Sequence, residues 1–160
     1  MRLVIAAIGR LKDDAERTLF DRYAGRLAGA GKPLALGPLE AIELSEGRQA
    51  SAEARRADEA ARLLDKVDGA GLVVALDEAG KTMSSEAFAR WLARARDDGT
   101  ASIAFVLGGP DGHGSPVVEA ARLKLSLGAM TLPHGIARVV LAEQLYRAAT
   151  ILAGHPYHRA

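Results

Sequence analysis

The chain has no cysteine among its 160 residues. Disulfide bonds, thiolate metal sites and a cysteine nucleophile are therefore excluded. Long apolar runs are also missing, and none approaches the roughly 20 residues that a membrane-spanning helix needs. The first residues, MRLVIAAIGRLKDD, join a short apolar run to charges without a small-residue cleavage site, which favours a buried first strand over a signal peptide. We expect a cytoplasmic protein that does not enter a membrane.

Two common nucleotide-binding motifs are absent as well. There is no Walker loop of the form Gly-x-x-x-x-Gly-Lys-Ser/Thr, and no Gly-x-Gly-x-x-Gly follows the first apolar run, Leu3–Ile8. Neither ATP hydrolysis nor nicotinamide chemistry is indicated. His155 and His158 lie close together, but no further Cys or His stands at ligand spacing, so we expect no metal site.

The composition is that of one ordinary folded domain. Hydrophobic residues make up 49% and charged residues 26%, enough for a core at this length, so we expect a single domain over residues 1–160. The net charge of +1 is uneven, because residues 120–160 carry five basic side chains and one acidic one, or +4, which leaves −3 for residues 1–119. The basic end is either a face for an anionic partner or a chance cluster of solvated charges. A local net charge of +4 produces only a modest electrostatic field, so free nucleic acid should bind weakly.

Strand-like and helix-like apolar patterns alternate along the chain. Strands are expected at Leu3–Ile8, Leu34–Leu44, Gly71–Asp77, Ala101–Leu107 and Leu125–Leu132, and helices at Asp13–Ala30, Ser51–Val67, Ser84 or Ser85 to Asp97, Ser115 to about Lys124, and Ile136–Ala153. We count about six strands and five helices in β-α-β order. This order predicts an α/β fold with an open, mainly parallel sheet and helices on both faces.

The last helix, Ile136–Ala153, is apolar around nearly its whole circumference. A helix of this kind is buried on more than one side. In a domain of this size, the pattern favours a subunit interface, and an ordinary core helix is the alternative.

A glycine-rich turn, Gly108–Gly114 (GGPDGHG), directly follows the strand Ala101–Leu107. Ligands of open α/β sheets lie beyond the carboxyl ends of the strands, and Leu76 and the run Leu127–Leu132 end neighbouring strands in the same way. Taken alone, the turn is as compatible with a structural role as with a functional one. Together, the three strand ends predict an apolar, glycine-lined slot. Such a slot suits an adenine ring without several phosphates, as in a sulfonium cofactor.

Three motifs resemble the RlmH family of SPOUT-superfamily methyltransferases: LGGPDG, SLGAMTLPHGIARVVLAEQLYRA and the ending HPYHR. The resemblance extends over the whole chain, including the MRLVIAAIG start and the LVVALDEAGK segment. It implies a single SPOUT domain with a deep C-terminal trefoil knot, a homodimer, and the cofactor S-adenosyl-L-methionine. The implied reaction is methylation of N3 of a pseudouridine in 23S ribosomal RNA, on the assembled ribosome.

The resemblance also implies which residues bind the cofactor. They are Leu76, Gly108, Leu127, Gly128, Ala129, Met130, Thr131 and Leu132. We expect His134, Arg138, Glu143 and Tyr157 to contact the RNA, with Tyr157 stacking on the base. Glu143 and Arg138 would also order the polar tail.

Methyl transfer from a sulfonium depends mainly on positioning, and N3 of a pseudouridine must also lose its proton. His158 is our candidate base and Arg159 our candidate for stabilising the developing negative charge. For each of these two residues, a plain surface or interface role is the alternative.

A non-catalytic ribosome-binding factor with the same fold is the competing function. A tRNA methyltransferase is disfavoured, because we find no appended RNA-binding domain.

Overall fold

The computed structural model describes residues 1–12 and 14–158. Strands and helices alternate along this part of the chain, as the sequence predicts. In chain order the elements are β1 (Arg2–Ile8), α1 (Ala15–Gly31), the 3-10 turn η1 (Lys32–Leu34), β2 (Leu39–Leu44), α2 (Ala52–Lys66), β3 (Leu72–Thr82), α3 (Ser85–Asp97), β4 (Ser102–Leu107), α4 (Ser115–Ala120), β5 (Leu123–Ser126) and α5 (His134–Leu152).

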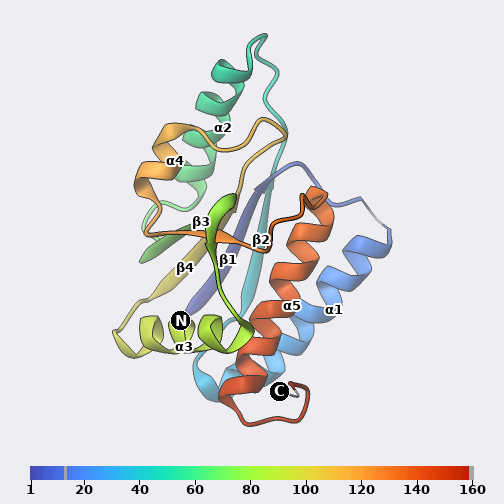
Figure 1. Cartoon of the computed structure of the whole chain (residues 1–160), viewed down its shortest axis with the longest axis vertical. Helices are drawn as coiled ribbons and strands as arrows, with labels where there is room; N and C mark the ends of the chain where they lie inside the picture. Colours follow the sequence, from blue (N-terminus) through green and yellow to red (C-terminus); the bar gives the residue numbers. More distant parts are fainter. Residues whose placement is uncertain (13, 159–160) are drawn as a thin grey trace.

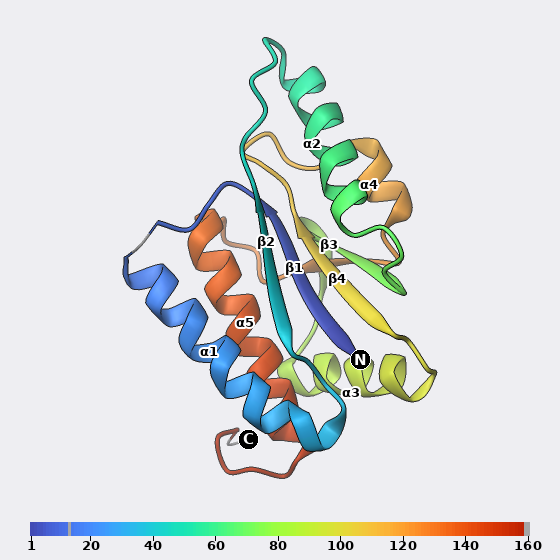
Figure 2. The same cartoon turned by 180° about the vertical axis from the view of Figure 1, so that it is seen from behind.

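The strands form one sheet in the order β2-β1-β4-β3-β5, and all neighbouring strands are parallel. Parallel neighbours need long crossover connections, which the helices supply. The sheet forms the middle of the molecule, with helices on either side (Figures 1 and 2). The predicted open parallel sheet with helices on both faces is thus confirmed. All its strands end at the same edge, where a ligand is expected in this class of fold.

Alternating side chains of β1 enter two separate hydrophobic cores. Leu3 and Ile5 belong to the core beneath α1, α3 and α5, whereas Ala6 and Ile8 belong to the core beneath α2 and α4. This period of two is that of a strand buried on both faces. β4, in the centre of the sheet, is buried along its whole length. The central strands therefore form a rigid base for the loops at their carboxyl ends.

Helix α5 packs against both α1 and α3 on one face of the sheet (Figure 1). Its buried residues include Val139, Leu141, Leu145 and Ala149. The nearly all-round apolar character of this helix is therefore explained within one chain, and it does not by itself require a second subunit. In the described part of the chain, no helix is both long and apolar enough to cross a bilayer.

The described residues contain five strands, not about six, and two predicted strands are shorter than expected. The segment predicted as Leu34–Leu44 begins with η1, which has Pro33 in its first turn. Ala35 and Gly37 then adopt φ values of 53° and 89°, which no strand accommodates, so β2 starts only at Leu39. The cost of this turn falls mainly on Ala35, since glycine adopts positive φ freely.

The strand predicted as Leu125–Leu132 is also different, because β5 ends at Ser126. The Ser126 hydroxyl accepts the Gly128 N–H at 3.2 Å and donates to the Gly128 carbonyl at 3.0 Å, and this turns the chain away from the sheet. Gly128 has a φ of +142°, which favours glycine. The apolar residues that follow therefore form a loop.

Two further boundaries differ from the prediction. Helix α4 ends at Ala120 rather than near Lys124, because the Arg122 N–H already donates to the Val73 carbonyl at 2.9 Å beside the sheet. β3 extends to Thr82, past the loop predicted at Gly80-Lys81. Its register with β5 shifts between Leu76 and Lys81, so that loop is an irregularity within the strand.

Candidate cofactor and active site

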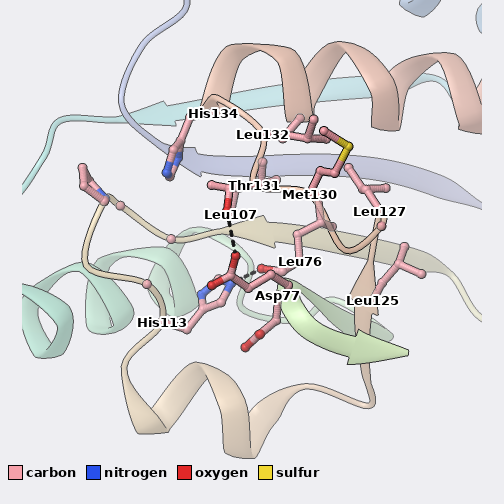
Figure 3. A pocket seen from close by; sticks show the side chains of 17 residues that line it. Leu76, Asp77, Leu107, His113, Leu125, Leu127, Met130, Thr131, Leu132 and His134 are labelled. Atoms are coloured by element: carbon pink, nitrogen blue, oxygen red, sulfur yellow. Dashed lines mark hydrogen bonds between the residues drawn. The ribbon is translucent and has the colours of Figure 1, made fainter. Parts of the chain in front are cut away.

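A cavity of about 290 Å³ opens at the carboxyl ends of β3, β4 and β5 (Figure 3). Its walls come from the strand ends and the two loops that follow β4 and β5. The lining residues are Leu76, Asp77, Glu78, Leu107, Gly108, Gly109, Pro110, Gly112, His113, Leu125, Leu127, Gly128, Met130, Thr131, Leu132, His134 and Ala137. These lining residues include no lysine or arginine. The cavity therefore suits an apolar or cationic ligand better than one with several phosphates.

The glycine turn after β4 presents bare backbone to this cavity. Its Gly112 N–H donates to the Gly109 carbonyl at 2.9 Å, and Gly112 has a φ of +83°. A Cβ on Gly108 would lie 2.8 Å from the Gly112 carbonyl oxygen, so the turn closes through contact of backbone with backbone. A Cβ on Gly112 or Gly128 would meet no atom within 4 Å. The lining thus contains space that a side chain would fill, where a ligand can approach the backbone.

The loop from Leu127 to Pro133 forms the opposite wall. The Thr131 hydroxyl donates to Glu78 at 3.3 Å, which links this loop to the irregular part of β3, past the point where β3 pairs with β4 (Figure 3). Met130 is 83% exposed although it is a large apolar residue beside a cavity. An exposed methionine of this kind suits contact with a bound molecule or a partner surface.

His113, at the end of the glycine turn, is bonded to the neighbouring strand end. Its Nε2 lies 2.8 Å from the Leu76 carbonyl and must donate, since a carbonyl only accepts (Figure 3). Its Nδ1 is then an acceptor, buried and without a partner among the described residues. Burial lowers the pKa of His113, against the opposing effects of the Leu76 carbonyl and Asp77. The imidazole is therefore neutral near pH 7.

His134 is the first residue of α5 and lines the cavity on the side opposite His113 (Figure 3). Burial and the nearby Arg138 cation both lower its pKa, whereas Glu46 and Glu59 oppose them. It is therefore a second neutral imidazole at the cavity, available as a hydrogen-bond donor and acceptor.

Arg138, one turn further along α5, is only 3% exposed. Its guanidinium donates to the Ile8 and Gly9 carbonyls at 2.8 and 3.0 Å and to Glu43 at 3.1 Å. Burial would raise the pKa of Glu43, but the Leu11 N–H, Arg17 and Arg138 outweigh it and lower the pKa. Arg138 thus joins α5 to the ends of β1 and β2, and none of these bonds involves the described part of the tail, residues 155–158.

Glu143, Tyr157 and His158 are linked to one another through direct contacts and Arg147, and none of the three lines the cavity. The Tyr157 hydroxyl donates to Glu143 at 3.0 Å, and Glu143 also accepts from Arg147 at 2.5 Å. Nε2 of His158 lies 2.7 Å from Glu86 on α3. The tail is therefore packed against α5, and Glu143 does order it. Arg159 lies outside the described residues.

Of the residues predicted to bind the cofactor, all except Ala129 line the cavity, and of those predicted to contact RNA only His134 does. The roles of all these residues stay predictions.

The sequence did not single out His113 or Glu78, although His113 stands within the glycine motif that marks the site. Among the described residues, no group of His, Cys, Asp and Glu could hold a metal ion.

Comparisons with known proteins identify relatives along the whole chain. Residues 1–158 match the family model described as predicted SPOUT methyltransferase. The chain is 50% identical over 160 residues to "Ribosomal RNA large subunit methyltransferase H" of Xanthobacter autotrophicus and 49% identical to the protein of the same name from Brucella anthropi, covering 100% of both chains in each case.

Among solved structures, the SpoU methyltransferase AviRb from Streptomyces viridochromogenes, in complex with AdoMet, aligns with a TM-score of 0.41 and 14% identity over 97% of this chain and 58% of that chain. The family model and the full-length relatives agree with the resemblance noted in the sequence motifs. The chain belongs to the SPOUT methyltransferase family, in the group whose members are named ribosomal RNA large subunit methyltransferase H.

Proposed function

We propose that this protein transfers a methyl group from S-adenosyl-L-methionine to N3 of a pseudouridine in 23S ribosomal RNA, and that it acts on the assembled ribosome. The observation that carries the proposal is the glycine-lined cavity at the sheet edge, in a chain half identical over its full length to proteins named as large-subunit ribosomal RNA methyltransferases. Residues 1–160 would form one catalytic domain, with its C-terminal segment threaded as a trefoil knot.

The cavity fits this cofactor by shape and by charge. Gly112 and Gly128 leave backbone open to an adenosine, Gly108 closes the turn against the Gly112 backbone, and the leucines of the lining offer apolar surface. Asp77 and Glu78 add negative charge at the cavity, which complements a sulfonium and an ammonium group. Leu76, Gly108 and residues 127–132 would therefore hold the cofactor, and His113 would fix the wall through the Leu76 carbonyl.

When bound, the cofactor supplies an electrophilic methyl group on a positively charged sulfur. The acceptor N3–H bond breaks as the N–CH₃ bond forms, so the proton must pass to a base. We assign this proton to Nδ1 of His158, which would first release the Arg147 guanidinium because Nε2 donates to Glu86, and the developing negative charge on the ring to Arg159. His134, Arg138, Glu143 and Tyr157 would position the RNA and the tail, since orientation of the reacting groups supplies most of the acceleration.

A tail with these roles must act on the cavity of a second copy. His158 is anchored beside Arg147 and Glu86, whereas His134 lines the cavity. With a rise of 1.5 Å per residue, the helix places His134 and Arg147 about 20 Å apart. We therefore propose a homodimer in which the tail of one copy completes the cofactor site of the other.

The competing function is a ribosome-binding factor that keeps the fold but does not bind the cofactor. Calorimetric titration with S-adenosylmethionine separates the two. We expect one binding site per chain, competition by S-adenosylhomocysteine, and no binding of ATP, whose phosphates would meet no basic residue in the lining. A folded protein that binds neither sulfur compound would favour the non-catalytic factor.

A further inference from the structure

Glu59, on α2, is a buried carboxylate that the proposed reaction does not use. Only 3% of the residue is exposed. Its Oε1 accepts the Gly47 N–H at 2.7 Å, whereas its Oε2 is buried without a hydrogen-bond partner among the described residues. A buried charge is costly unless it is compensated. Its presence behind the wall of the cofactor cavity therefore calls for a functional explanation.

Two glycines, Gly47 and Gly109, lie against the Glu59 carboxylate, which also interacts electrostatically with the Arg55 cation. A Cβ on Gly109, within the glycine turn, would lie 2.6 Å from Glu59 Oε2. A Cβ on Gly47 would lie 3.3 Å from Oε1, and one on Gly114 would lie 2.6 Å from the Arg56 carbonyl. The carboxylate thus fits between the turn that lines the cavity and the loop that precedes α2.

The same helix holds the turn at a second point. Nε of Arg55 donates to the Asp111 carboxylate at 2.7 Å, and this bond lowers the pKa of Asp111. Residues 55 and 59 are four apart and share one face of α2. The helix therefore contacts the turn at both Gly109 and Asp111, on either side of Pro110.

Glu59 also acts on the opposite wall of the cavity. It is one of two carboxylates whose field opposes the lowering of the His134 pKa. Glu59 is thus in contact with one cavity wall and electrostatically coupled to another, although it does not itself line the cavity.

We propose that Glu59 is a positioning residue that holds the glycine turn, through Gly109, in the conformation that the cofactor requires, and that links the loop around Gly47 to it. This inference rests on the proposed function, in which the cavity binds S-adenosylmethionine. A merely structural role would change the melting temperature. A positioning role changes cofactor affinity in a protein that is still folded.

The test is calorimetric titration of S-adenosylmethionine into the full chain carrying Glu59→Ala, Glu59→Gln or Asp65→Ala. We expect Glu59→Ala to weaken binding about tenfold or more, the scale of one hydrogen bond to a charged group. Glu59→Gln keeps the volume and the acceptor for the Gly47 N–H, so it should recover most of the affinity. Asp65→Ala, on the same helix but with its carboxylate 74% exposed, should bind as the parent does.

A double-mutant cycle keeps the inference testable if Glu59→Ala is unstable. Gly109→Ala places a methyl group against Oε2 and should weaken binding, whereas combining it with Glu59→Asp, whose shorter side chain leaves room, should restore part of the affinity. Parental affinity in a folded Glu59→Ala protein, or strictly additive effects in the cycle, would overturn the role of Glu59. A parent that does not bind the cofactor would instead overturn the proposed function.

Discussion

His113 illustrates how burial determines the chemistry of a single residue in the cavity. The imidazole bridges the glycine turn and β3 through the Leu76 carbonyl, just past the last residue of β3 that pairs with β4, and this bond requires a proton on Nε2 only. Protonation of Nδ1 would place a donor in a buried position that offers no acceptor among the described residues. The cavity wall is therefore stable with neutral His113 and strained with the cation.

Cofactor binding should consequently weaken in mild acid. A histidine in an unfolded chain has a pKa of about 6.5, and burial lowers that of His113 in the folded protein. The unfolded chain thus takes up the proton first as the pH falls, so the contribution of His113 to the free energy of unfolding is complete above about pH 6.5 and is lost as the pH falls from there through the lowered pKa of the folded protein. Cofactor affinity depends on the folded protein, so we expect affinity for S-adenosylmethionine, measured by calorimetry between pH 8 and pH 5, to fall only as the pH passes through that lowered pKa.

His113→Gln, which keeps a donor for the Leu76 carbonyl but does not titrate, should flatten this pH dependence. The exposed His155 provides the matched control, and His155→Gln should leave the profile unchanged. An identical fall in the parent and in His113→Gln would show that another group is responsible.

Gly108→Val should abolish most cofactor binding while the protein stays folded. The added Cβ would lie 2.8 Å from the Gly112 carbonyl oxygen, so the turn would have to open where it lines the cavity. Gly29→Val, on α1, is the control, because a Cβ at this position meets no atom within 4 Å. Calorimetry with S-adenosylmethionine gives the affinity, and circular dichroism gives the fold. Unchanged affinity in a folded Gly108→Val protein would remove Gly108 from the site.

At the scale of elements, the tail after α5 is better packed than its polar sequence suggests. The Tyr157 ring lies 4.7 Å from that of Tyr146, and burial and Glu143 raise the pKa of Tyr157, so its hydroxyl stays protonated and donates to Glu143. Tyr157 and His158 thus pack against α5 and α3, whereas His155 and Pro156 are exposed. Such long-range contacts between side chains leave no periodic signal in the sequence.

Removal of the Tyr157 hydroxyl should therefore affect both stability and catalysis. We expect Tyr157→Phe to lose one partly buried hydrogen bond, about 1 kcal/mol, and to melt about 2–4 °C lower than the parent. Cofactor affinity should be nearly unchanged, since Tyr157 is proposed to contact the RNA and not the cofactor, but methylation of ribosomes should slow. A variant with the parental melting temperature and the parental rate would show that the tail contributes to neither.

Element types were predictable from the sequence, because apolar period and turn residues are local signals. The Ser84 hydroxyl caps α3 by accepting the Ala87 N–H, as its position before the helix predicts. The end of β5 was not predictable from hydrophobicity, since Leu127, Met130 and Leu132 continue the apolar pattern into the loop. In this loop the apolar residues line a cavity and do not pair in the sheet.

The candidate site was predictable only in part, for the same reason. Residues next to strand ends, such as Gly108 and Leu76, were found because parallel strands bring their carboxyl ends together. Glu59 and Arg138 were not understood from the sequence, because their roles depend on which loops the fold places against them. Arg138 in particular donates a hydrogen bond to the carbonyl of Gly9, which directly follows β1 and lies 129 residues earlier in the sequence.

At the scale of the whole molecule, the separation between the cavity and the tail makes the oligomeric state decisive. The apolar surface of α5 is covered within one chain by α1 and α3, so the argument for a dimer rests on the composite site. Light scattering should give about twice the chain mass of 16.8 kDa. A monomer at micromolar concentration that still methylates ribosomes would rule out a catalytic tail from a second copy.

The central claim is that this chain methylates a pseudouridine of 23S ribosomal RNA with a cofactor bound at the glycine turn. The most direct test incubates unmodified ribosomes and S-adenosylmethionine with the parental protein or with Gly108→Val, and maps the 23S RNA by mass spectrometry. We predict that one pseudouridine-containing fragment gains a single methyl group with the parent and none with the variant. The claim would be contradicted if the parent bound the cofactor and the ribosome but left every fragment at its original mass.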